Sequence, residues 1–126
     1  SISFSDPDLN GVQHITLAAA QSNFLSIPTD CPQRERRGWL GDAQLSSRTN
    51  SLNFDMAAPY TSFVQQIADA QEPPTGANPG AVPDCVPWYG HGHLPADPAW
   101  GSAFTFLADL VAEQYDDNAI FARHYS

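Results

Sequence analysis

The residues best suited to chemistry are concentrated between Thr29 and Gln44. This segment, called the signature segment below, holds three carboxylates, three of the five arginines and one of the three tryptophans: Asp30, Glu35, Asp42, Arg34, Arg36, Arg37 and Trp39. Pro32, Gly38 and Gly41 interrupt it, so we do not expect one regular helix. Charged loops on a rigid scaffold are common sites of binding and catalysis. The alternative is a solvated loop whose Arg–carboxylate pairs each contribute little to stability.

Helical patterns flank the signature segment on both sides. Asp6 and Pro7 form a helix start, because Asp is a favoured N-cap and Pro suits the first helical position, and we predict a helix over residues 7–23. A second helix is predicted from about Asp42 to Asn53. The Asp42 carboxylate is favourable near that helix N-terminus, which is a structural role for it.

Three further helices are predicted downstream. Residues 58–71 carry an apolar stripe at helical spacing, which marks a core face: Tyr60, Phe63, Val64 and Ile67. Residues 100–115 are apolar nearly all round, so this helix should lie between layers. Its second apolar face, with Phe106 and Leu110, would need a further partner. A last helix is predicted from Asn118 to the chain end.

Residues 72–98, called the proline-rich loop below, contain most of the eleven prolines and four of the eight glycines. This composition predicts no regular element. Interspersed apolar side chains predict an ordered loop that packs on the helices: Val82, Val86, Trp88, Tyr89 and Leu94. His91, His93 and Asp97 are metal-ligand types, but zinc sites normally have at least three well-spaced ligands. We therefore predict no metal and no cofactor, and expect this loop to be functional in another way.

The composition is strongly acidic, with a net charge of −9 and a pI near 4.4. Nucleic acids and anionic membrane surfaces select for Lys and Arg, so neither is expected as a partner. No apolar run approaches the length of a membrane span, and no signal-peptide pattern is visible. The acidity, the lack of Lys and the many prolines favour a secreted or extracellular protein.

Two cysteines, Cys31 and Cys85, are too few for a disulfide scaffold. They could form one bridge in an oxidising compartment, or they could be two free thiols. The bridge is the weakly favoured interpretation. It would join the signature segment to the proline-rich loop, and it requires Cα atoms no more than about 7 Å apart.

The run D-C-P-Q-R-E-R-x-G-W-x-G-D-A-Q resembles the signature of family-78 glycoside hydrolases, the α-L-rhamnosidases. The similarity continues in Q-S-N-F-L-S-I-P before it, in A-V-P-D followed by Pro87, in D-P-A-W-G, and in the closing D-D-N-A-I-F-A-R-H-Y. It thus covers nearly the whole chain. The resemblance implies an all-α fold that is part of an (α/α)6 toroid of six helical hairpins, with the site in the toroid mouth.

The chain provides fewer helices than a complete toroid needs. We therefore expect residues 1–126 to be a single partial domain, the first part of the toroid. The remaining hairpins would lie on the same or another chain.

The resemblance also implies site roles. Glu35 would be the general acid of an inverting mechanism, in which one carboxyl protonates the leaving oxygen and another activates water. A terminal α-L-rhamnose of a glycan or glycoside would be contacted by the following residues: Asp30, Arg34, Trp39, Asp42 and Trp100. Trp39 would present its ring to the sugar, the two aspartates would accept hydrogen bonds from hydroxyls, and Arg34 would donate. No carboxylate of this sequence matches the catalytic base.

A general acid must stay protonated near the working pH, which nearby cations oppose. We therefore expect the guanidinium groups of Arg34 and Arg36 to point at Asp30, Asp42 or other acids. Glu35 should face the pocket beside Trp39 or Trp100.

Two positions depart from the family pattern. Ser102 stands where Asp is common after P-A-W-G, and Arg37 stands where an apolar residue is commoner. The loss of a carboxylate at 102 and the absence of a base support a second interpretation. In it, the chain is a catalytically inactive relative with a structural or carbohydrate-binding role in a larger assembly. A generic helical interaction module would not explain the signature segment.

Overall fold

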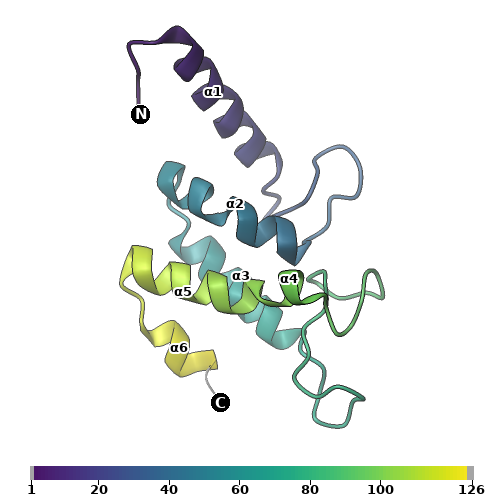
Figure 1. Ribbon diagram of the computed structural model, residues 1–126. Coiled ribbons are helices and arrows are strands. Elements are labelled where there is room, and N and C mark those ends of the chain that lie inside the picture. Colours follow the sequence, from purple (N-terminus) through teal and green to yellow (C-terminus); the bar gives the residue numbers. More distant parts are fainter. Residues whose placement is uncertain (1, 125–126) are drawn as a thin grey trace.

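The computed structural model describes residues 2–124, and this part of the chain is helical, without any β-strand beyond two isolated bridges. Its helices in chain order are α1 (Pro7–Ser22), α2 (Leu40–Asn53), α3 (Ala57–Asp69), α4 (Pro98–Gly101), α5 (Ala103–Tyr115) and α6 (Ala119–His124). Figure 1 shows α2, α3 and α5 packed as a central bundle, with α6 beside α5 and α1 projecting away. The predicted all-α class is confirmed. None of the described helices is both long and apolar enough to span a membrane.

Helix α1 begins where the sequence predicts. The Asp6 carboxylate caps it by accepting a 2.8 Å hydrogen bond from the Asp8 N–H, and Pro7 occupies the first turn. The helix buries none of its residues fully, and Val12 and Ile15 are exposed. It is therefore tied to the bundle by only a few side chains.

Helix α2 begins at Leu40, slightly before the predicted start near Asp42. Its N-cap, Trp39, offers no side-chain hydrogen bond to the first turn. Instead the Leu40 N–H donates to the Asp84 carbonyl oxygen at 2.9 Å. A backbone group of the proline-rich loop thus satisfies one of the free N–H groups at this helix start.

The core lies between α2, α3 and α5. The predicted stripe of α3 is fully buried, with no solvent exposure at Tyr60, Phe63, Val64 or Ile67. It packs with equally buried side chains of the neighbouring helices, Leu40, Leu107 and Val111. Burying each large apolar side chain contributes about 1.5–3 kcal/mol. These contacts hold α2, and with it the signature segment, in place.

The helix predicted over 100–115 is broken at Ser102 into α4 and α5. The Asp97 side chain caps α4 through the Ala99 N–H at 2.9 Å. The prediction of an exposed second apolar face is right for Phe106, which is 59% exposed, and wrong for Leu110, which is 4% exposed. Leu110 is buried because it turns toward α2. The last helix, α6, lies within the predicted range, whose final two residues are outside the described part.

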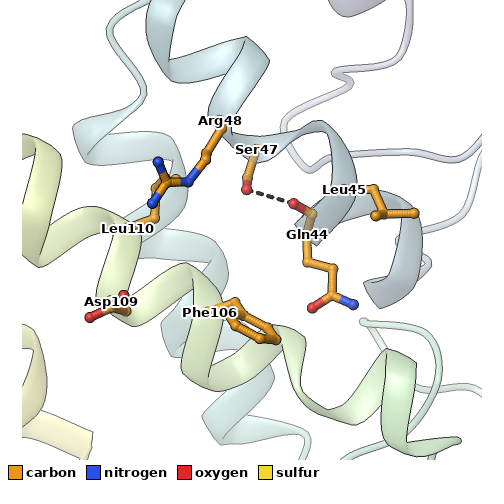
Figure 2. Close-up of a pocket in the computed structure, with 7 residues that line it drawn as sticks. All are labelled: Gln44, Leu45, Ser47, Arg48, Phe106, Asp109 and Leu110. Carbon is orange, nitrogen blue, oxygen red and sulfur yellow. Dashed lines mark hydrogen bonds between the residues drawn. The ribbon is translucent and has the colours of Figure 1, made fainter.

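Figure 2 shows the pocket between α2 and α5, where Phe106, Asp109 and Leu110 face a row of α2 residues. Its volume is about 320 Å³. Leu45, on the α2 side, is 84% exposed. None of the carboxylates of the signature segment lines this pocket, so it is separate from the site predicted from the sequence.

Candidate active site

The two long loops meet at the start of α2. Figure 1 shows both on the same side of the molecule, next to α4. Trp39 and Cys85 form an isolated antiparallel bridge, and the Val86 N–H donates to the Gly38 carbonyl oxygen at 2.9 Å. A Cβ at position 38 would collide with the Val86 carbonyl oxygen, so glycine is required there for the loops to approach.

The Asp30 carboxylate is fixed by its own loop. Oδ1 accepts from the Arg37 N–H at 2.9 Å, and Oδ2 accepts from Cys31 Sγ at 2.6 Å. Burial raises the pKa of Asp30, but these hydrogen bonds lower it more, so the net pKa lies below the ordinary value. Asp30 is therefore a pre-oriented, ionised hydrogen-bond acceptor.

Glu35 lies against Trp39, one of the two tryptophans expected beside it, but it does not line the pocket that Asp30 and Asp42 share. Its Oε2 accepts a 2.8 Å hydrogen bond from Trp39 Nε1, and its backbone N–H donates to Cys31 Sγ at 3.2 Å. The Arg–carboxylate ion pairs within residues 2–124 are Arg48–Glu113 and Arg123–Asp117, and His93 makes a hydrogen-bond contact with Asp84. Glu35 is exposed and belongs to none of them.

The predicted orientation of the arginines is wrong. Arg36 has a left-handed backbone, with φ of 55°, and its Nε donates to the Pro32 carbonyl oxygen at 2.7 Å. This turn directs the side chain back to its own loop, and Arg36 forms no ion pair with Asp30 or Asp42. Arg34 is exposed and makes no ion pair with another described residue.

Asp42 shares a pocket with Asp30. The pocket is open, holds about 450 Å³, and lies between α1, the signature segment and α2. Its other polar lining comes mainly from hydroxyl and amide side chains: Thr16, Asn23, Thr29, Ser46, Thr49 and Asn50. Burial raises the pKa of Asp42, and the charges of Asp30 and Glu35 raise it further, against a lowering by its own backbone N–H. The negative charges of Asp30 and Glu35 thus act on the Asp42 carboxyl.

Of the five predicted substrate contacts, Asp30 and Asp42 line this pocket, and Arg34, Trp39 and Trp100 do not. The Trp100 indole packs on Gly41, where a Cβ would overlap the ring. Its Nε1 is buried without a hydrogen-bond partner, and Trp100 does not line the Asp30–Asp42 pocket. In the described part of the chain it therefore packs α4 against α2.

The two cysteines are free thiols, so the favoured bridge is not formed and the second alternative describes the structure. The sulfur of Cys31 is occupied within its own loop, between Asp30 Oδ2 and the Glu35 N–H. Cys85 is 1% exposed. Burial raises the pKa of its thiol to about 12, with a further rise from Asp84.

Asp84 is a buried, hydrogen-bonded carboxylate for which the sequence predicted no role. It is 3% exposed, and its carboxylate accepts from the His93 N–H at 2.8 Å and the Asp97 N–H at 2.9 Å. His93 Nδ1 also lies 2.9 Å from Asp84 Oδ2. Asp84 thereby ties together the end of the proline-rich loop. The only sequence signal was its place in the A-V-P-D run.

His91 and His93 serve contacts within the protein. His93 pairs with Asp84, and the ring of His91 packs edge-on against Trp39 at a centroid distance of 5.5 Å. Within residues 2–124 no group of three or more His, Cys, Asp or Glu side chains is arranged to hold a metal ion.

The fold is that of the six-hairpin helical domains. The model of the bacterial α-L-rhamnosidase six-hairpin glycosidase domain matches residues 1–126. The chain therefore belongs to this family of α-L-rhamnosidase six-hairpin domains.

Individual relatives agree with this assignment. An α-L-rhamnosidase of Formosa agariphila is 32% identical in an alignment 126 residues long, which covers 99% of this chain and 13% of the relative. One from Streptomyces avermitilis is 31% identical and covers 92% of this chain and 11% of the relative. The chain thus spans about an eighth of the length of the first of these relatives.

Solved structures show the same fold. The structure of an α-L-rhamnosidase from Dictyoglumus thermophilum superposes with a TM-score of 0.86 at 38% identity, over 96% of this chain and 13% of that one. The structure of the Aspergillus terreus α-L-rhamnosidase gives a TM-score of 0.81 at 28% identity, over 98% of this chain and 14% of that one. The predicted assignment to a six-hairpin helical domain is confirmed.

Proposed function

We propose that the complete protein carrying this chain hydrolyses terminal α-L-rhamnosides with inversion, and that Glu35 is the general acid. The observation that carries this proposal is the hydrogen bond from Trp39 to Glu35, in the same segment as Asp30 and Asp42, which line one pocket. It places a carboxyl group, an aromatic ring and two hydrogen-bond acceptors within one short segment. Relatives named as α-L-rhamnosidases support the substrate class.

In this mechanism the pocket holds the sugar and Glu35 acts on the leaving oxygen. Asp30 is held ionised and accepts a hydrogen bond from a rhamnose hydroxyl. Asp42, unpaired with any described cation, accepts from a second hydroxyl. Arg34 donates from its exposed guanidinium group, and Trp39 presents its ring to the apolar face of the sugar. Glu35 then protonates the oxygen that leaves.

Inversion also requires a general base that activates water on the opposite face of the sugar. In inverting glycosidases the two carboxyl groups are about 6.5–9.5 Å apart. We assign no described carboxylate to this role. The proposal therefore includes a base from a further part of the toroid, on the same or another chain.

A second function is favoured by position 102. Ser102 Oγ lies 3.4 Å from Gln44 Oε1 and 3.3 Å from the Ala99 carbonyl oxygen, where the family commonly has a carboxylate. A neutral side chain there supports a relative that binds rhamnosides without cleaving them.

One experiment separates the two functions. The complete protein is incubated with 4-nitrophenyl α-L-rhamnoside, and the anomeric signals of the first product are followed by NMR. The enzyme hypothesis predicts release of β-L-rhamnose before mutarotation, and slower release in Glu35→Gln. Binding of the rhamnoside without any release would favour the second function. Release of α-L-rhamnose first would contradict inversion.

A further inference from the structure

A row of aromatic side chains from the proline-rich loop leads to the proposed acid. His91 packs edge-to-face on Trp39, with ring centroids 5.5 Å apart and an interplanar angle of 74°. Tyr89 lies nearly parallel to His91, at 6.4 Å and 16°. Trp39 in turn donates its N–H to Glu35. The row Tyr89–His91–Trp39 therefore ends at the carboxylate that would protonate the leaving oxygen.

The outer end of this row is held by a residue that departs from the family pattern. The guanidinium carbon of Arg37 lies 5.1 Å from the centroid of the Tyr89 ring, in cation–π geometry. The Arg37 backbone also exchanges hydrogen bonds with Asp30, through its N–H and its carbonyl oxygen. Arg37 thus links Tyr89 to the loop that holds Asp30. An apolar residue at position 37 could not form this cation–π contact.

The loop that carries these rings is anchored at its base. The buried Asp84 carboxylate holds His93 and Asp97, and Gly92 sits against Asp84 and the Trp39 ring with a left-handed φ of 84°. A side chain at position 92 would be strained and would press on both neighbours. The rings of Tyr89 and His91 are therefore presented on an ordered turn.

Although the turn is anchored, its rings face solvent. Tyr89 is 55% exposed, and His91 is also exposed. Exposed aromatic rings held in place favour stacking with a planar or ring-shaped ligand, because little conformational freedom is lost on binding.

We propose that Tyr89 and His91 form the binding surface for the group attached to the leaving oxygen, and that this group carries a ring with an apolar face. The inference rests on the proposed function, because Glu35 defines which side of the sugar the leaving group occupies. An aryl ring and a pyranose ring share the chemistry required, since each offers an apolar face for stacking. A small alkyl group offers none.

The test compares leaving groups in the complete protein. We expect Tyr89→Ala to lower the ratio of kcat/KM for phenyl over methyl α-L-rhamnoside by about 2- to 10-fold, the range that an aromatic pair contributes. Tyr89→Phe keeps the ring and should keep the ratio. Arg37→Leu should lower the ratio by a smaller factor, because the ring remains but is held less firmly. A rhamnosyl-glucose disaccharide shows whether a sugar ring responds as the phenyl ring does.

An unchanged ratio in Tyr89→Ala would overturn the inference and leave the proposed function intact. If the unmodified protein hydrolyses no rhamnoside, the proposed function fails, and calorimetric binding then decides the inference. Tighter binding of phenyl than of methyl α-L-rhamnoside, lost in Tyr89→Ala, would support it. Equal binding of the two compounds by the unmodified protein would contradict it.

Discussion

Trp39 Nε1 donates a 2.8 Å hydrogen bond to Glu35 Oε2. The same tryptophan pairs with Cys85 of the proline-rich loop and precedes the first turn of α2. The proposed acid is thus oriented by a residue whose backbone is fixed by two other parts of the fold.

This relationship predicts a two-step response at position 39. Trp39→Phe removes the N–H donor and keeps an aromatic face, so we expect kcat/KM on an aryl rhamnoside to fall about 2- to 10-fold, which corresponds to the loss of one hydrogen bond. Trp39→Ala removes the ring as well, so kcat/KM should fall further in that variant. Steady-state kinetics on the complete protein measures both. A Trp39→Phe variant as active as the unmodified protein would show that the N–H does not position Glu35.

Asp30 predicts a pH dependence of stability. The pKa of Asp30 in the folded protein lies below its ordinary value of 3.8. Ionised Asp30 therefore stabilises the fold above pH 3.8, and this contribution is lost as the pH falls through the folded pKa. We expect Asp30→Asn to lower the free energy of unfolding at pH 7 by about 1–3 kcal/mol through weaker hydrogen bonds. The difference from the unmodified protein should shrink below pH 3.8. Urea unfolding across this pH range measures it, and a constant difference would contradict the account.

Two glycines should respond oppositely to the same substitution. Gly38→Ala places a Cβ on the Val86 carbonyl oxygen, so we expect a loss of about 1–3 kcal/mol in unfolding free energy. Gly11→Ala is the matched control, since no atom lies within 4 Å of its Cβ and the residue sits inside α1. Gly11→Ala should raise the free energy of unfolding by about 0.5–1 kcal/mol. Equal effects in denaturant titrations would mean that the two loops do not approach as described.

Asp84 should control the order of the proline-rich loop. In Asp84→Asn an amide group would face some of the N–H donors of His93 and Asp97, leaving buried groups unsatisfied. We expect faster proteolysis between residues 85 and 97. The exposed Asp109→Asn is the control and should cleave like the unmodified protein. Unchanged cleavage of Asp84→Asn would show that Asp84 does not anchor the loop.

The cysteines should differ in reactivity toward an alkylating reagent. In the native protein Cys31, which is half-buried, should react first. Cys85 should react only after unfolding, because it is buried and its pKa is raised to about 12. Mass spectrometry after alkylation counts the added groups. Absence of any alkylation after denaturation without reductant would restore the disulfide predicted from the sequence.

Much of this fold could be predicted from local patterns. The Asp6–Pro7 cap and the Tyr60–Ile67 stripe depend on near neighbours, so both appear in the structure where expected. The burial of Leu110 could not be predicted, because it depends on how α5 packs against α2. The same holds for the break at Ser102, which separates α4 from α5.

The candidate site, too, could be predicted only in part from the sequence. The signature segment already contained Glu35 and Trp39, and Trp39 was one of the two tryptophans expected beside Glu35. The direction of Arg36 depends on a left-handed residue in a loop, which no periodic pattern indicates. Asp84 and Tyr89 reach the site only through the packing of one loop on another. Such long-range contacts are absent from sequence patterns.

The central claim is that Glu35 protonates the leaving oxygen, and a leaving-group series with Glu35→Gln tests it most directly. A general acid contributes about 10²–10⁴-fold for a poor leaving group and little for one that departs without a proton. We therefore predict a large loss of kcat/KM for methyl α-L-rhamnoside and a small loss for 2,4-dinitrophenyl α-L-rhamnoside. An equal loss for both substrates would contradict the assignment of Glu35 as the acid.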